Sequence, residues 1–537
     1  MKRMAILPVL LSVSMTISAQ DIAEVKDLLY NERYASAEQL LEQKVADPAH
    51  DAELNYLLIK TYFEQDKKEE ATQFVESHHE AIPGTEPMNH IAYGRYLLGI
   101  GNTTEADTFF DQLLEDRKTK KNPLLLMTIA EAYIDAEKGD AKKALAVLDM
   151  ASNKDKKNAE MDVLRGKAYR KLGDGSNAYL AYKDALEKDP SNLQAHYLMG
   201  KIFVTQKNTS IYMEHFNKAY EIDSTYVPVL DELYDHYYYR DTKEARKYLS
   251  AYIANADKSI ENDYRWTDML YLAGDYNAAI ASAKELLKNE KEDAQPRLYK
   301  LIAYAYEASG DSLSAKNSIE KYFAKEEPSK WIAADYDFRA RMAQKTGDEI
   351  NAMNYYIKAA ELDSLPANKI KYAGQIADLA KWLKDYHTQA IWLGNFNRWN
   401  ENSTNVDLFY WGIAHYYARE YAESDSVFAQ YVAKYPEHIA GYYWRATNNA
   451  AIDTAMALGT AVPFYEKVVE MAEKENKDEN KPRLVKAYSY LGGYEANIKK
   501  NYPAALAWFE KFHAIDPENA DGAKYVELLK KWIADGK

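Results

Sequence analysis

A short pattern of small and aromatic residues recurs about every 34 residues along this chain, and no other feature constrains the fold as strongly. Its clearest copy consists of Gly166, Tyr169, Ala178, Tyr182, Ala185 and Pro190. The next copy follows 34 residues on with Gly200, Phe203, Tyr212, Phe216 and Ala219, and the last copy has Gly493, Ala505, Phe509 and Pro517. A fixed period of this length is typical of helical hairpins stacked into an array.

The pattern has a physical reason in the packing of two antiparallel helices. Helices approach closely only where a side chain is small, so Gly166 and Ala178 suit the crossing point while Tyr182 fills the space beside it. Pro190 ends the second helix, because proline cannot continue a helix. These residues resemble the tetratricopeptide-repeat family, whose unit is a helix, a tight turn and a second antiparallel helix. The resemblance implies that the first helix of each unit lines a concave surface.

The small residue of the second helix gives a ruler along the chain. Its steps run from 33 to 38 residues, except for one step of 44 that contains the charged run 473–481. Tyr212, Gln389 and Ser424 depart from the small-residue rule. The ruler positions are Ala37, Ala71, Ala106, Ala144, Ala178, Tyr212, Ala245, Ala279, Ala315, Ala352, Gln389, Ser424, Ala461 and Ala505.

The period and the resemblance together predict an all-α protein. We expect a right-handed superhelical solenoid of about fourteen tetratricopeptide-like units over residues 20–520, followed by a capping helix and tail over 521–537. A solenoid buries its core between neighbouring units, so such an array can extend without a domain break.

The first nineteen residues predict export. Lys2 and Arg3 precede an apolar stretch over 4–17 that is too short to span a membrane, and Ala19 suits a cleavage site. A retained anchor helix is the alternative. The chain contains no cysteine, so it can have neither disulfides nor a lipid-modified cysteine at a new amino terminus. We therefore expect a bacterial protein that begins at Gln20, is periplasmic or secreted, and is not stably inserted in a membrane.

Composition and motifs argue against several classes of function. Lys and Arg number 68 against 83 Asp and Glu, a formal net charge of −15, which repels phosphate backbones and argues against a nucleic-acid partner. His79 and Glu80 begin like a zinc-protease motif, but Pro83 occupies the place of its second histidine. No thiol nucleophile is available and no phosphate-binding glycine loop is present. We expect no enzymatic activity, no metal and no cofactor.

Tyrosine is unusually abundant, with 46 Tyr beside only 14 Phe. Tyrosine joins an apolar ring to a hydroxyl that needs a partner, so it suits half-exposed walls. Projection onto the family's first-helix face predicts tyrosines along an inner wall, where they either fill gaps between helices or contact a partner. Basic residues, including Lys60 and Arg95, project onto the amino-terminal half of this wall. The predicted partner-binding groove consists of Tyr234, Tyr237, Tyr238, Tyr264, Tyr271, Tyr416, Tyr417, Tyr443, Tyr490, Tyr494, Lys167, Arg170, Lys171 and Lys201.

A groove of this composition predicts a non-catalytic exported scaffold that binds a protein or peptide. Basic side chains could pair with carboxylates of an acidic or extended segment, and aromatic rings could cover its apolar side chains. The alternative is a glycan-binding helical-repeat protein that stacks exposed Tyr and Trp rings on sugars. A glycan array distinguishes the two partners.

Overall fold

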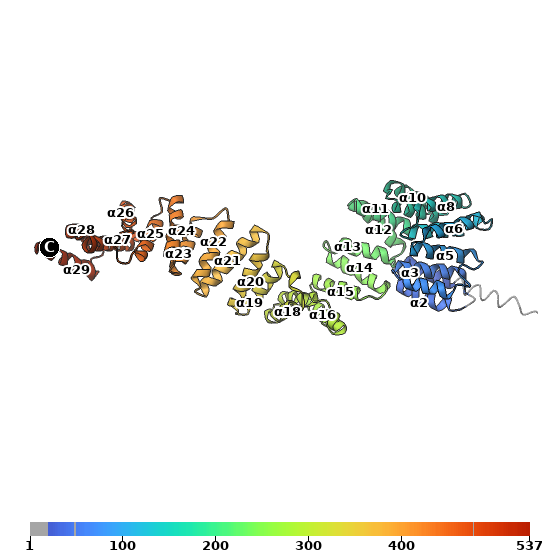
Figure 1. Ribbon diagram of the computed structural model, residues 1–537, viewed down its shortest axis with the longest axis horizontal. Coiled ribbons are helices and arrows are strands. Elements are labelled where there is room, and N and C mark those ends of the chain that lie inside the picture. Colours follow the sequence, from blue (N-terminus) through green and yellow to red (C-terminus); the bar gives the residue numbers. More distant parts are fainter. Residues whose placement is uncertain (1–19, 48–49, 476, 537) are drawn as a thin grey trace, which may run out of the picture. The chain divides into compact units, whose positions relative to one another are not determined.

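The computed structural model describes residues 20–47, 50–475 and 477–536, and every regular element in these ranges is helical. The predicted signal peptide, residues 1–19, lies outside the described residues. The chain divides into two compact units, which meet between Lys288 and Asn289 within one helix. We call them the amino-terminal unit and the carboxy-terminal unit (Figure 1).

The amino-terminal unit opens with a helix over residues 20–30. Its further elements are α2 (Tyr34–Val45), α3 (Ala52–Glu64), α4 (Lys68–Ser77), α5 (Pro87–Ile100), α6 (Thr103–Glu115), the short turn η1 (Thr119–Lys121), α7 (Pro123–Asp135), α8 (Ala141–Ser152), α9 (Ala159–Lys171), α10 (Gly175–Lys188), α11 (Leu193–Thr205), α12 (Thr209–Ile222), α13 (Val227–Tyr237), α14 (Thr242–Asn255), α15 (Ile260–Leu272) and α16 (Tyr276–Glu290), in which the division falls.

The carboxy-terminal unit continues the same succession of helical pairs. Its elements are η2 (Lys291–Asp293), α17 (Arg297–Ala308), α18 (Ser312–Lys325), η3 (Pro328–Lys330), α19 (Ala333–Lys345), α20 (Glu349–Leu362), α21 (Pro366–Trp382), α22 (Tyr386–Trp399), α23 (Asn405–Tyr417), α24 (Tyr421–Lys434), α25 (Ile439–Ile452), α26 (Val462–Glu475), η4 (Asp478–Asn480), α27 (Lys481–Tyr494), η5 (Glu495–Lys499), α28 (Tyr502–Ile515) and α29 (Ala520–Ala534).

The sequence ruler marks the second helix of each of fourteen pairs. Every ruler position is at most 9% exposed, and all but Ala461, which directly precedes α26, lie within the even-numbered helices from α2 to α28. Ser424, one of the departures from the small-residue rule, is accommodated by hydrogen bonds. Its hydroxyl donates to the Gly412 carbonyl at 2.8 Å and accepts from the Asn448 amide at 2.8 Å. The predicted register is confirmed at this position.

The expected close crossing of the two helices is present. A Cβ atom on Gly166 would lie 2.2 Å from the Tyr182 ring, so only glycine fits there. In the last repeat, however, the tight contact is made by Gly492, whose added Cβ would lie 2.6 Å from the Phe509 ring, and not by the predicted Gly493. The π-helical turn η5 lies between this glycine and α28. Such a turn accommodates one extra residue, which accounts for the one-residue shift.

The helical pairs run in succession along the described chain, as the period predicted. Helical pairs follow one another from residue 20 to Ile515, and the closing helix α29 lies where the capping helix was expected. Contacts within this succession group it into the two compact units. The ruler gave no indication of this division, because the step that crosses it, from Ala279 to Ala315, has an ordinary length of 36 residues.

Candidate functional site

A cavity of about 410 Å³ lies among the first helices of the amino-terminal unit. Its walls come mainly from residues 20–30 and from α3, α7, α9 and α11, which are the helices that the family resemblance implied for a concave surface. The volume lies in the range of small-ligand sites. Its charged and tyrosine wall residues are Lys26, Lys60, Lys167, Glu32, Glu53, Glu64, Glu131, Asp135, Glu160, Tyr30, Tyr34, Tyr56, Tyr197 and Tyr226.

The amino-terminal unit closes on itself through the start of α2. The carboxylate of Asp257, which follows α14, accepts hydrogen bonds from the backbone N–H groups of Ala35 at 2.8 Å and Ser36 at 3.2 Å, and from the Ser36 hydroxyl. The residue before α2 provides no side-chain cap of its own. Asp257 therefore caps α2 from more than 220 residues away, where a carboxylate also interacts favourably with the helix dipole.

A second contact joins the same two regions. The Asn31 side-chain oxygen accepts a hydrogen bond from the Val227 N–H at 3.3 Å, and the rings of Tyr30 and Tyr226 lie 5.0 Å apart. In Figure 1, α2 and α3 accordingly lie near α13 and α14. Because of these contacts, the cavity is lined by residues that are nearly 200 positions apart in the sequence.

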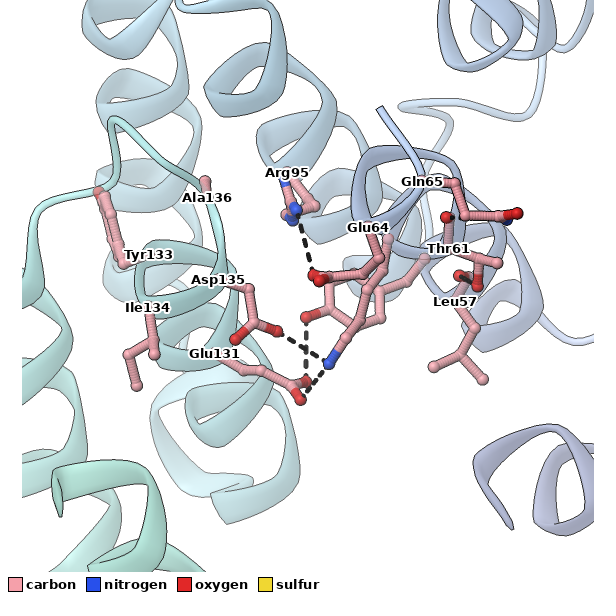
Figure 2. Close-up of polar contacts among 12 residues, drawn as sticks. Leu57, Thr61, Glu64, Gln65, Arg95, Glu131, Tyr133, Ile134, Asp135 and Ala136 are labelled. Carbon is pink, nitrogen blue, oxygen red and sulfur yellow. Dashed lines mark hydrogen bonds and ion pairs between the residues drawn. The ribbon is translucent and has the colours of Figure 1, made fainter. Parts of the chain in front are cut away.

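Lys60 is the centre of a charge cluster on the cavity wall. Its ammonium lies 2.6 Å from Glu131 and 2.8 Å from Asp135, and the Tyr56 hydroxyl donates to Glu131 at 3.0 Å (Figure 2). Burial opposes both charges of the pair, but their mutual attraction outweighs it. The pKa of Lys60 is therefore raised, and that of Asp135 is held below its ordinary value by Lys60 and Lys167.

The neighbouring basic groups are also held by the chain. Arg95 is only 2% exposed, lies over the Phe63 ring at 5.0 Å, and faces Glu64, with 3.9 Å between the closest nitrogen and oxygen (Figure 2). The Lys171 ammonium donates to carbonyl oxygens at the end of α7, including that of Ile134 at 2.9 Å, and burial lowers its pKa. A cation at a helix carboxyl end satisfies carbonyl groups that have no intrahelical partner.

These contacts correct the predicted basic wall. Lys171 serves the end of α7, and Lys201 pairs with Glu232, so neither side chain is available to attract an acidic segment. Arg170 lies at the surface. Lys60 and Lys167 are the predicted basic residues that line the cavity, and among the described residues the Lys167 ammonium has no ion-pair partner within 4 Å.

Three wall carboxyls remain outside strong ion pairs. Burial raises the pKa values of Glu32, Glu64 and Glu160 above the ordinary glutamate range. Nearby lysines lower these values only in part, Lys201 acting on Glu32 and Lys167 on Glu160. The wall thus carries acidic groups whose ionised forms are poorly compensated by the chain.

The predicted tyrosines near α13 and α15 are mostly structural. Tyr234 and Tyr264 are buried, the latter with 1% exposure, so they are not surface contacts. Tyr237, Tyr238 and Tyr271 are half-buried. Tyr237 stacks on another tyrosine ring at 5.7 Å, and Tyr238 packs edge to face on Tyr234 at 5.4 Å. The gap-filling alternative therefore holds for Tyr234 and Tyr264.

The predicted tyrosines of the carboxy-terminal unit divide in the same way. Tyr490 is buried and is corrected to a core residue, with its ring 4.8 Å from a neighbouring buried tyrosine. Tyr494 contacts the chain's own segment between α25 and α26, where a Cβ on Gly459 would lie 2.6 Å from its hydroxyl. Tyr416 and Tyr443 are half-buried, whereas Tyr417 is exposed. Their role in binding a partner stays a prediction.

Sequence reasoning did not find the residues that give the cavity its character. Glu131 and Asp135 lie 71 and 75 positions after Lys60, about two repeats away, a spacing that a search between adjacent repeats passes over. Tyr30 and Tyr226 lie at the ends of repeats that meet only through the closure. The 34-residue period of the sequence does not predict the contact between Tyr30 and Tyr226.

Comparisons with known proteins agree with the fold. A family model described as tetratricopeptide repeat matches residues 22–84, and one described as TPR repeat matches residues 166–207. Anaphase-promoting complex subunit 3 of Schizosaccharomyces pombe is 26% identical over 139 residues, which are 26% of this chain and 20% of that protein. The chain thus spans about a fifth of the length of this curated relative.

Two solved structures resemble parts of the chain. The C-terminal part of a TPR repeat-containing protein from Cytophaga hutchinsonii is 25% identical, with 49% of this chain and 99% of that chain covered and a TM-score of 0.30. A protective antigen of uropathogenic Escherichia coli displaying an SLR fold is 15% identical, with 78% and 90% covered and a TM-score of 0.34.

The succession of helix-turn-helix pairs, with a cavity among the first helices, defines an α-helical repeat protein. The chain contains tetratricopeptide repeats, matched directly over residues 22–84 and 166–207. Within the described ranges, no helix is both long and apolar enough to cross a membrane.

Proposed function

We propose that this protein is a non-catalytic scaffold that holds a segment of a partner protein or peptide in the cavity of its amino-terminal unit. The tetratricopeptide-repeat fold itself indicates a role in protein interaction. The observation that carries the proposal is the cavity of about 410 Å³, which has both tyrosine and charged walls. An extended segment could bury apolar side chains against the rings and pair its polar groups with the walls.

A cavity-blocking variant tests the proposal. Leu124 lines the cavity and Leu180 does not, yet the two side chains are similarly exposed at 48% and 52%. Peptides selected from a random display library on the full chain should lose at least tenfold in affinity for Leu124→Trp. They should bind Leu180→Trp as they bind the unsubstituted protein. Equal binding to both variants would exclude the cavity as the peptide site.

A glycan is the second candidate partner, for a different surface. Trp382 is 66% exposed in the carboxy-terminal unit, and Tyr410 and Tyr417 are also exposed. Flat exposed rings can stack on sugar faces. A glycan array should give hits that are lost in Trp382→Ala and kept in Leu313→Ala, an exposed residue without a ring. An array without hits would remove this alternative.

We also propose that the protein acts outside the cytoplasm after cleavage following Ala19. The basic start and the short apolar stretch of residues 1–19 support this proposal. Amino-terminal sequencing of the protein recovered from a periplasmic or culture fraction should begin at Gln20. Recovery of an intact Met1 terminus from the cytoplasm would contradict it.

A further inference from the structure

Three tyrosine rings that line the cavity lie together, and one wall carboxylate interacts electrostatically with two of them. The ring centroids of Tyr30 and Tyr226 lie 5.0 Å apart, and those of Tyr197 and Tyr226 lie 5.6 Å apart, edge to face. Glu32 also lines the cavity and interacts electrostatically with Tyr226. We call Tyr30, Glu32, Tyr197 and Tyr226 the tyrosine corner.

The hydroxyl of Tyr226 is not used in the hydrogen bonds of the described chain. Tyr226 is 2% exposed and lines the cavity, yet among the described residues its hydroxyl has no hydrogen-bond partner. Two other buried tyrosines of this unit are paired, Tyr56 with Glu131 at 3.0 Å and Tyr133 with a carboxylate at 2.8 Å, whereas the hydroxyl of Tyr182, which does not line the cavity, is unpaired as well. The Tyr226 oxygen is therefore available to accept a hydrogen bond from a ligand in the cavity.

The chain holds its own guanidinium groups with the same combination of groups. The Arg265 carbon Cζ lies 4.6 Å and 4.8 Å from the ring centroids of Tyr234 and Tyr252, and its guanidinium pairs with Asp231. Arg339 is held in the same way, by two rings at 4.3 Å and 4.1 Å and one carboxylate. Aromatic faces attract cations through the ring quadrupole, and a carboxylate adds direct charge pairing.

In the tyrosine corner the rings and the carboxylate are present without a cation from the chain. Among the described residues, no lysine or arginine lies over the rings of Tyr30, Tyr197 or Tyr226. Of the charged groups that act on Glu32, Lys201 is bound to Glu232. Asp231, which also acts on Glu32, is bound to Arg265. Lys167 is therefore the ammonium acting on Glu32 that is not already paired.

The charge balance of the whole cavity points in the same direction. Six carboxylates and three lysines line it. Lys26 and Lys60 are already paired with wall carboxylates at 2.6 Å. Glu64 faces Arg95 at 3.9 Å, so the groups left over are Glu32 and Glu160 against Lys167, and burial penalises the ionised form of both glutamates. A positively charged ligand would reduce that penalty.

We propose that the tyrosine corner binds the cationic side chain of a lysine or arginine in the incoming peptide, with Glu32 as its counter-ion. This inference rests on the proposed peptide-binding function and names the chemistry that the cavity selects. The ligand charge is opposite to the one expected from the sequence, because Lys60, Lys171 and Lys201, three of the basic residues that suggested an acidic segment, are bound by the chain's own groups.

The experiment uses four acetylated and amidated pentapeptides, Gly-Gly-X-Gly-Gly, in which X is Arg, Lys, Gln or Glu. Their affinity for the full chain is measured by isothermal titration calorimetry. The Arg and Lys peptides should bind at least tenfold more tightly than the Gln peptide, and the Glu peptide should bind no better than Gln. Equal affinity for Arg and Gln, a preference for Glu, or no binding by any of the four overturns the cation assignment.

Substitutions test whether the tyrosine corner is responsible for the preference for cationic peptides. Glu32→Gln should weaken the Arg peptide about tenfold, while Glu285→Gln, an exposed site on α16, should leave it unchanged. Tyr226→Phe should weaken it about threefold without lowering the melting temperature, because the hydroxyl has no partner in the chain. Lys167→Gln should strengthen it, because a competing ammonium is removed. Equal effects of Glu32→Gln and Glu285→Gln would overturn the inference.

Failure of this inference is distinguishable from failure of the proposed function. If library peptides lose affinity for Leu124→Trp but show no dependence on Lys or Arg, the cavity binds peptides and the cation assignment is wrong. If Leu124→Trp has no effect on any peptide, the proposed function fails as well.

Discussion

The two units are built from the same helical pair, yet they treat charged and aromatic side chains differently. The amino-terminal unit joins Asp257 to α2 and gathers paired charges and tyrosines around a cavity. The carboxy-terminal unit exposes more large apolar side chains, fifteen against seven among the described residues, with Trp382 and Leu458 among the most exposed. The repeat decides how neighbouring helices pack, whereas a few polar contacts between distant repeats decide whether an inner surface becomes a walled cavity.

Breaking the central charge cluster should have the largest effect on this difference. Lys60→Met leaves Glu131 and Asp135 without their cation, and we expect a loss of about 3 kcal/mol in unfolding free energy. In the carboxy-terminal unit, Lys511→Met breaks a pair that is also 2.8 Å long but far more exposed, and should cost under about 1 kcal/mol. Chemical denaturation measures both. Equal losses would mean that the cavity wall does not strengthen the pair.

Opening the closure should have the next largest effect. Asp257→Ala removes three hydrogen bonds from the start of α2 and should cost about 2 kcal/mol. Asp311→Ala removes an ordinary cap from α18 and should cost about 1 kcal/mol. Hydrogen exchange followed by mass spectrometry should show faster exchange in α2 for Asp257→Ala and in α18 for Asp311→Ala. Unchanged exchange in α2 would show that the closure is not maintained in solution.

Acidification should affect the two units differently. Burial raises the pKa values of Glu32, Glu64 and Glu160, so the folded amino-terminal unit binds more protons than its unfolded chain at mildly acidic pH. Its stability should therefore rise as the pH falls from 7 towards the unfolded glutamate value of about 4.3. In the carboxy-terminal unit, the hydrogen bond from Lys316 lowers the pKa of Asp348, whose stabilising effect is lost below about pH 4.

Hydrogen exchange at pH 7 and pH 5, corrected for the intrinsic rates, checks this prediction. Protection should increase at pH 5 in α3 and α9 and stay level in α18 and α20. A variant that carries Glu32→Gln, Glu64→Gln and Glu160→Gln should lose the increase. If α3 and α9 become less protected at pH 5, the sign of the burial effect on these carboxyls is wrong.

Most of the fold could be predicted from the sequence, because helix pairing depends on neighbours. Gly166 and Tyr182 are 16 positions apart, and their contact repeats down the chain with the same period. The predicted repeat register is correct even at Ser424, where hydrogen bonds satisfy the buried polar side chain. The predicted register is wrong by one residue at Gly493, because the π-helical turn η5 is a local irregularity that spacing alone does not reveal.

The candidate site could be predicted only in its location. First helices do line the cavity, and Lys167 is among its wall residues. The roles of the charged residues could not be predicted, because Lys60 is neutralised by residues two repeats away and Glu32 interacts with Tyr226 from a distant repeat. A projection onto one helix face shows which way a residue points along its own repeat. It does not show which distant group it meets.

The smallest effect on stability, and the last way to sharpen the comparison, concerns the exposed rings of the carboxy-terminal unit. Because Trp382 and Tyr417 are exposed, a variant with Trp382→Ser and Tyr417→Ser should change the unfolding free energy by no more than about 0.5 kcal/mol. Contiguous exposed apolar surface binds hydrophobic dyes, so this variant should bind less bis-ANS than the unsubstituted chain. In the amino-terminal unit, Tyr239→Ser changes a ring that is even more exposed but belongs to a unit with fewer exposed apolar side chains. Tyr239→Ser should therefore reduce dye binding less than the double variant does. Equal reductions would mean that the two units do not differ in the apolar surface that binds the dye.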